Sequence, residues 1–188
     1  MEHEPIVVTG AGCVSALGHS VEMFWSALQD GRCGLGKLEE PAPSDLKVSI
    51  VGAIPAPDPR QMLDARRLPM LDRFSVLAIV AAQQALAQSG LSLQDSGHRT
   101  GCVVGVGTAG GGAIDELYRK IYREGAKRAN VFTVPRVMPS APASQISMAY
   151  GIRGPVFTVS SACASSNHAI ASHRLCGCCA TLSSMQQS

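Results

Sequence analysis

The stretch Val156-Phe157-Thr158-Val159-Ser160-Ser161-Ala162-Cys163-Ala164-Ser165 joins an apolar, β-branched run to a series of small residues around one thiol. Val156 to Ser160 is typical of a buried strand, and it runs directly into Cys163 at the expected start of a helix. At such a junction, backbone N–H groups and the positive end of the helix dipole favour the thiolate form of a cysteine. Cys163 is therefore a candidate nucleophile, although most free cysteines are simply small buried residues.

Strands and helices alternate in the residues before this stretch. Ser140 to Tyr150 is predicted to form a helix that ends at Gly151. Gly101 to Val106 is predicted to form a second buried strand, followed by the glycine-rich residues Gly107 to Gly112 and a helix from about Ile114 to Glu124. The alternation and the apolar strands predict an α/β domain with a mixed sheet flanked by helices.

The first ninety residues contain further elements. Pro5 to Thr9 is predicted to be a buried strand, and Ser20 is the expected N-cap of the helix that follows it. Six prolines lie in residues 34–69, where Val48 to Ile54 is the one expected strand. Asp72 to Gln88 is the longest helical pattern, and its many alanines predict close packing of this helix.

Composition excludes several classes of protein. The chain has 188 residues, a hydrophobic fraction of 46%, a charged fraction of 16% and a net charge of +2, with no basic stripe for nucleic acid. It has neither a secretory signal pattern nor an apolar run long enough to span a membrane, so we expect a soluble, cytoplasmic protein. Seven cysteines at irregular spacing favour reduced thiols over a disulfide framework.

Several motifs resemble the β-ketoacyl-[acyl-carrier-protein] synthases, the condensing enzymes of fatty-acid and polyketide synthesis. The motifs are Val7-Val8-Thr9-Gly10-Ala11-Gly12, Asp72-Arg73-Phe74-Ser75, the Gly105 to Gly112 loop, Met138-Pro139-Ser140-Ala141-Pro142-Ala143, and Arg153-Gly154-Pro155 with Val159 to Ser165. The resemblance implies a thiolase-like layered fold, usually a homodimer, of which this chain supplies the N-terminal half. We expect residues 1–172 to form the synthase domain and residues 173–188 to be an atypical tail outside the fold.

The resemblance also implies a mechanism. Cys163 attacks an acyl thioester on acyl carrier protein, and malonyl-carrier protein then loses carbon dioxide and attacks the acyl enzyme. Thr108 corresponds to the head of the acyl pocket, although a turn residue explains it equally well. No cofactor and no metal are expected. Two histidines of the second half complete this chemistry in the family, so condensation by this chain alone is not expected.

Two rival readings name other sites. Gly105-x-Gly107-x-x-Gly110 lies between a strand and a helix, as a dinucleotide fingerprint does, but no acidic residue follows at the required distance. A zinc site can be drawn from His173, Cys176, Cys178 and Cys179, but it has no second paired segment of ligands.

Other residues have ordinary explanations beside functional ones. His168 is the one histidine near Cys163 in sequence, and its helical position predicts a structural side chain that points away from the thiol. Arg128, Asn130 and Arg136 are expected near the dimer surface, or else in a solvated loop. A third class of function is non-catalytic: a fragment or binding partner that contacts acyl carrier protein or a complete synthase.

Overall fold

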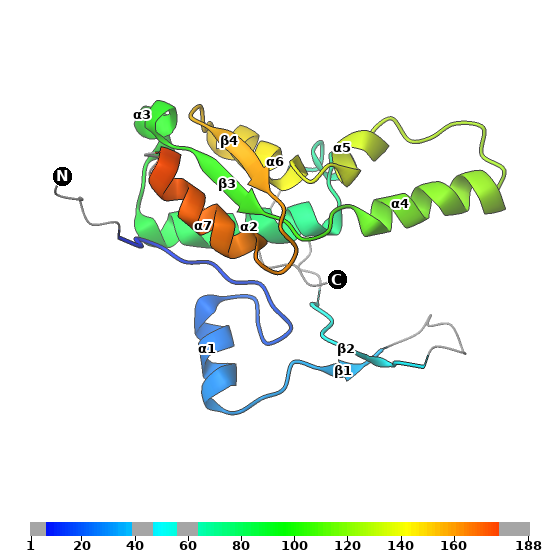
Figure 1. Ribbon diagram of the computed structural model, residues 1–188, viewed down its shortest axis with the longest axis horizontal. Helices are drawn as coiled ribbons and strands as arrows, with labels where there is room; N and C mark the ends of the chain where they lie inside the picture. Colours follow the sequence, from blue (N-terminus) through cyan, green and yellow to red (C-terminus); the bar gives the residue numbers. More distant parts are fainter. Residues whose placement is uncertain (1–6, 39–46, 56–63, 177–188) are drawn as a thin grey trace.

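A pair of parallel strands lies at the centre of the computed structural model, which describes residues 7–38, 47–55 and 64–176 (Figure 1). The strands are β3 (Cys102–Gly105) and β4 (Val156–Val159), and the register pairs Cys102 with Val156 and Gly105 with Val159. Both strands therefore end at the same edge of the sheet. The two strands predicted around these residues are confirmed.

Helices cover both faces of the pair. α7 (Ser165–Cys176) packs on one face, and α6 (Ala141–Tyr150) packs on the other, with α2 (Arg73–Ser89) against α6. Ile146 of α6, Val80 of α2 and Val103 and Val104 of β3 are among the largest fully buried side chains. We call these five elements the packed body. They confirm the predicted α/β arrangement of a sheet flanked by helices.

Capping residues set the ends of these helices. The Asp72 carboxylate accepts a hydrogen bond from the Arg73 N–H at the start of α2, and Gly90 and Gly151 end α2 and α6 at φ values of +63° and +67°. The same Asp72 carboxylate also accepts a hydrogen bond from the Ala113 N–H, at 3.2 Å, in the first turn of α4. One side chain therefore holds the beginnings of two helices.

α4 (Gly111–Tyr118) begins three residues before the predicted Ile114 and continues as a π-helical turn, Arg119–Arg123. Its early start follows from Gly110, whose φ of +64° turns the chain into the helix and whose carbonyl accepts the Ile114 N–H. The shorter helices are α3 (Leu93–Ser96), α5 (Thr133–Val137) and the 3₁₀ turns Leu68–Met70 and Gly97–Arg99.

Residues 7–38 and 47–55 form the N-terminal arm. It contains α1 (Val21–Gln29), capped by the Ser20 hydroxyl as predicted, and a two-residue antiparallel pair, β1 (Gly36–Lys37) and β2 (Ile50–Val51). The strand predicted over Val48 to Ile54 is thus confirmed for its central residues alone.

The strand predicted over Pro5 to Thr9 is wrong for the described residues Val7 to Thr9, which belong to no strand. Just beyond them the chain passes α2, where the Gln88 side chain accepts the Ala11 N–H at 2.6 Å and the Gln84 side chain accepts the Cys13 N–H at 3.0 Å. Side-chain oxygens of α2 therefore accept these two backbone N–H groups, as carbonyl oxygens of a neighbouring strand do in a sheet. Val7 and Val8 stay 71% and 88% exposed.

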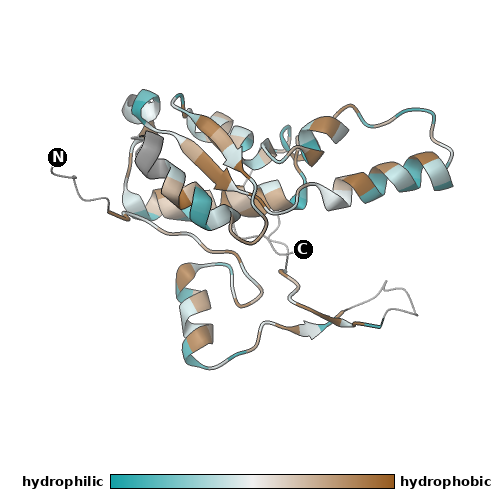
Figure 2. Cartoon of the chain, viewed as in Figure 1, coloured by the Kyte–Doolittle hydropathy of each residue, from teal (hydrophilic) through white to brown (hydrophobic). Residues whose placement is uncertain are grey.

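Hydropathy follows the same division. In Figure 2 the apolar colour is concentrated on β3, β4 and α2, while the N-terminal arm also carries apolar residues at its surface. Within the described ranges, no helix is both long enough and apolar enough to cross a membrane. On β3, Cys102 is fully buried, and burial raises the pKa of its thiol from the ordinary 9.0 to about 12.

Candidate active site

Cys163 lies in the short connection between the end of β4 and the start of α7 (Figure 1). Its side chain is exposed, two residues before the first residue of the helix. The connection is a tight turn, since the Ala164 N–H donates to the Ser161 carbonyl and the Ser165 N–H donates to the Ala162 carbonyl, both at 3.1 Å. The structure therefore gives the thiol the strand-to-helix position that the sequence predicted for it.

Ala162 has the backbone conformation that makes this turn. Its φ of +50° is the one left-handed value at a non-glycine residue of the described chain. A side chain with a Cβ atom is strained in that region, and such strain is often found at functional sites. The residue directly before the thiol is therefore held in a shape that an isolated chain avoids.

Gly105 allows α7 to begin directly against the sheet. A Cβ atom at this position would lie 2.5 Å from the carbonyl carbon and oxygen of Ser165. Strand and helix thus touch backbone to backbone, and no side chain fits between them. The same contact explains the first glycine of the Gly105-x-Gly107-x-x-Gly110 pattern, and Gly110 lies equally close to Val137. Packing alone therefore accounts for both outer glycines of the dinucleotide-like pattern.

The buried Ser165 hydroxyl links the turn to both neighbours. Its oxygen accepts the Ser161 N–H at 2.9 Å, and its hydrogen has the Ala162 carbonyl at 2.6 Å and the Val106 carbonyl at 3.3 Å as acceptors. Each of these contacts fixes backbone rather than substrate. Ser165 therefore holds the residues around Cys163 against the end of β3.

Thr108 follows the end of β3 as Cys163 follows the end of β4. Because the strands are parallel and in register, both residues come from the same edge of the sheet. Thr108 is exposed, and a Cβ atom on the neighbouring Gly107 would lie 3.6 Å from the Ala162 carbonyl. The glycine-rich loop thus passes beside the turn that carries the thiol.

Comparison with known proteins identifies the family. The family model described as "Beta-ketoacyl synthase, N-terminal domain" matches residues 3–176. The chain belongs to the β-ketoacyl synthase family. This membership confirms the resemblance seen in the sequence motifs.

The curated relatives of this synthase chain are more than twice as long as the region that matches it. It is 44% identical over 168 residues to Nodulation protein E of Rhizobium sp. (strain N33), a match that covers 89% of this chain and 42% of that protein. It is 29% identical over 171 residues to 3-oxoacyl-[acyl-carrier-protein] synthase 2 of Vibrio cholerae, with 90% and 41% coverage. The chain therefore spans about two fifths of the length of these relatives.

Solved structures confirm the thiolase-like fold. A β-ketoacyl synthase from Burkholderia phymatum STM815 superposes with a TM-score of 0.77 at 24% identity, over 89% of this chain and 42% of that one. A type II polyketide ketosynthase, solved in complex with its acyl-carrier protein, gives a TM-score of 0.76 at 24% identity, with 97% and 52% coverage. At these identities the likeness concerns the fold alone.

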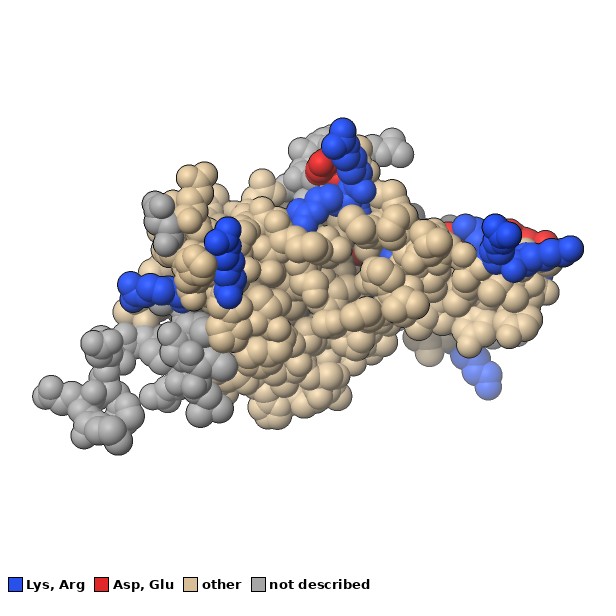
Figure 3. Space-filling model, turned by 90° about the horizontal axis from the view of Figure 1, so that it is seen from above, with Lys and Arg blue, Asp and Glu red and all other residues tan. Residues whose placement is uncertain are grey.

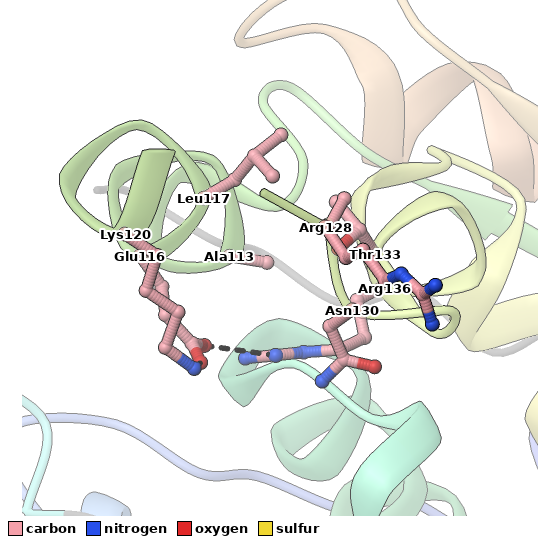
Figure 4. A pocket seen from close by; sticks show the side chains of 9 residues that line it. Ala113, Glu116, Leu117, Lys120, Arg128, Asn130, Thr133 and Arg136 are labelled. Atoms are coloured by element: carbon pink, nitrogen blue, oxygen red, sulfur yellow. Dashed lines mark hydrogen bonds and ion pairs between the residues drawn. The ribbon is translucent and has the colours of Figure 1, made fainter. Parts of the chain in front are cut away.

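A second polar cluster of this β-ketoacyl synthase chain lies between α4 and α5, around a small pocket (Figure 4). Glu116 accepts hydrogen bonds from Lys120 at 2.6 Å and from Arg136 at 2.9 Å. These two partners hold the pKa of the Glu116 carboxyl below its usual value. Arg128 and Asn130 line the same pocket. That these residues lie near a dimer surface stays a prediction.

Figure 3, seen from above, shows one group of charged side chains at the end where α4 projects and others at the upper middle and at the opposite end, separated by uncharged surface. The zinc set drawn from the sequence lies outside what the structure describes, because Cys178 and Cys179 are beyond residue 176 and the side chains of His173 and Cys176 are not described. Among the described residues, no group of three potential metal ligands comes together.

Sequence reasoning missed one partner of the synthase turn. The Ser161 hydroxyl lies 2.7 Å from Nδ1 of His168, in the first turns of α7. A search for a serine two residues before the candidate nucleophile and seven residues before a histidine would have found this pair. His168 therefore has a hydrogen-bond partner in the turn that carries the thiol.

Proposed function

We propose that Cys163 is the nucleophile of a β-ketoacyl synthase and carries the acyl group as a thioester. The observation that carries this proposal is an exposed thiol two residues before the start of α7, in a turn that hydrogen bonds fix on both sides. The first N–H groups of a helix have no partner within it, and together with the helix dipole they favour a thiolate nearby.

The acylation step exchanges one thioester for another. The Cys163 thiolate attacks the carbonyl carbon of an acyl thioester on acyl carrier protein, and a bond forms between that carbon and Sγ. The backbone N–H of Cys163 helps to stabilise the oxyanion. The bond to the carrier sulfur then breaks, and the released carrier thiol takes a proton from solvent. The acyl chain extends along the sheet edge that also presents Thr108, which we assign to the acyl pocket.

Acyl and malonyl carrier proteins are the proposed partners, and decarboxylative condensation in fatty-acid or polyketide synthesis is the proposed overall reaction. It needs groups from a second half of the fold, so the proposed share of this chain is the acyl-enzyme step. A homodimer and a cytoplasmic location complete the proposal. The ketosynthase solved with its acyl-carrier protein supports the choice of partner.

Mass spectrometry after incubation with an acyl carrier protein that carries an acyl thioester tests the acylation step. The wild-type chain gains the mass of one acyl group, and Cys163→Ala does not. Cys33→Ala is the matched control, because Cys33 is also exposed but lies in the N-terminal arm. It gains the acyl mass as the wild type does. A wild-type chain that stays unmodified, or a Cys163→Ala chain that is acylated, contradicts the proposal.

A further inference from the structure

The residues around Cys163 form a small network that the proposed mechanism does not use. Ser161 lies two residues before the thiol, and its hydroxyl lies 2.7 Å from Nδ1 of His168. Its N–H donates to the buried Ser165 hydroxyl at 2.9 Å. Ser161 is thus held at its backbone by one residue of α7 and at its side chain by another.

The two attachments of Ser161 lie next to the strained backbone of Ala162 and help to hold it. A non-glycine residue at a φ of +50° returns to an ordinary conformation unless its surroundings hold it. Ser165 holds the carbonyl of Ala162 at 2.6 Å, after the strained torsion. The His168 ring holds Ser161, before it. The two contacts thus fix the turn on both sides of the residue that aims the thiol.

The helix geometry suits His168 for this task. Its N–H donates to the Ala164 carbonyl at 3.0 Å, so its backbone is part of the first regular turn of α7. The ring is therefore anchored to the helix while it bonds the turn. Because Cys163 lies between Ser161 and Ala164, both attachments of His168 enclose the thiol-bearing residue in sequence.

We infer that His168 is a positioning residue that, through the Ser161 hydroxyl, holds the strained turn at Ala162 and so presents the Cys163 thiol to its substrate. His168 does not touch the reacting atoms in this role. The inference rests on the proposed function of Cys163, but it concerns the reactivity of the thiol before any acyl group arrives.

Alkylation by iodoacetamide measures that reactivity on the full chain, with peptide mass spectrometry to separate the cysteines. We expect His168→Ala and Ser161→Ala each to slow alkylation of Cys163 about fivefold, the ratio that one net hydrogen bond supports. Because the two side chains act as one unit, the double variant is expected to be no slower than either single variant. Exposed Cys33 is the internal reference, and its rate stays unchanged.

Two further variants separate positioning from a merely structural role. An asparagine side chain ends near the place of Nδ1, whereas a glutamine side chain ends near the place of Nε2. His168→Asn is therefore expected to keep most of the wild-type rate, and His168→Gln to react as slowly as His168→Ala. Helix propensity alone favours glutamine over asparagine, so a structural role predicts the opposite order. Ser161→Thr keeps the hydroxyl and serves as the matching conservative variant.

Unchanged or faster alkylation in His168→Ala and Ser161→Ala, or a glutamine variant that outperforms asparagine, overturns the inference. If a variant to alanine fails to fold, as judged by circular dichroism, the asparagine and glutamine pair decides alone. Failure of the proposed function is distinguishable, because it appears as missing acylation by acyl-carrier protein while the alkylation rates keep the expected order.

Discussion

Helix α6 in the packed body and helix α1 in the N-terminal arm differ in how much of their apolar surface is buried. α6 buries Ala143 and Ile146 completely, whereas in α1 Ala27 alone is buried and Trp25 remains 60% exposed. The sequence predicted Ser20 as the N-cap of α1 and Gly151 as the end of α6, and the structure has both. The difference shows that an apolar face predicts a helix, while burial of that face requires a second surface to pack on.

The largest expected effect concerns a glycine of the packed body. Gly105→Ala places a Cβ atom 2.5 Å from the Ser165 backbone, which cannot give way as a side chain does. We expect the free energy of unfolding, measured by urea denaturation, to fall by about 3 kcal/mol. Gly36→Ala in the arm is the control, because nothing lies within 4 Å of its Cβ position. Equal losses in both variants would erase the distinction between the two regions.

A pair of apolar truncations measures the burial difference directly. Ile146→Ala removes a fully buried side chain and is expected to lower the free energy of unfolding by about 2 kcal/mol or more. Trp25→Ala, at an exposed position of α1, is expected to change it by less than about 0.5 kcal/mol. Urea denaturation followed by circular dichroism compares the two. A loss of Ile146 size in Trp25→Ala means that the arm is packed in solution.

The helix caps sharpen the comparison at a smaller scale. Asp72→Ala removes a carboxylate that accepts N–H groups from two helices of the described chain, and we expect a loss of about 1.5 kcal/mol. Ser20→Ala removes the cap of α1, whose hydroxyl accepts the Met23 N–H alone. Its effect on urea denaturation is expected to be smaller than that of Asp72→Ala. The reverse order would place more stability in the arm than in the body.

The smallest effect is a pH dependence that belongs to the body. Because burial raises the pKa of Cys102 from 9.0 to about 12, the folded chain keeps this proton at pH values where the unfolded chain releases it. The resulting stability is complete below pH 9 and is lost as the pH rises from 9 towards 12. At pH 10 we expect the wild type to have lost about 1 kcal/mol more than Cys102→Ala, relative to pH 8.

Urea denaturation of both chains at the two pH values measures this difference. The exposed Cys33 of the arm gives the matching control, and Cys33→Ala is expected to follow the wild type. Parallel curves for the wild type and Cys102→Ala would mean that Cys102 is accessible to water.

Local sequence patterns predicted most elements of the packed body. Strands β3 and β4, helices α2 and α6, and the place of Cys163 between a strand and a helix all follow from runs of residues that carry their own start and stop signals. The run at Val7 and Val8 has the same apolar character, yet it forms no strand. The segment just after it is held by the side chains of Gln84 and Gln88, more than seventy residues away, and no local pattern reveals such contacts.

The contacts around the candidate site were equally out of reach. The bond between Ser161 and His168 depends on the left-handed turn at Ala162, which alanine disfavours. Glu116 meets Arg136 across twenty residues, and Asp72 meets Ala113 across forty-one. Each pair exists because two elements pack together, so the sequence names the residues without showing that they touch.

The carboxylate of Asp72 makes the first turns of α2 and α4 mechanically dependent on each other. The loop from Gly107 to Gly112, which passes beside the turn of Cys163, enters α4 at this shared anchor. A sideways shift of the loop must therefore either break the hydrogen bond between Asp72 and Ala113 or move the first turn of α2, a helix of seventeen residues. The glycines therefore allow the backbone conformation of this loop, while the hydrogen bonds of Asp72 restrict its movement.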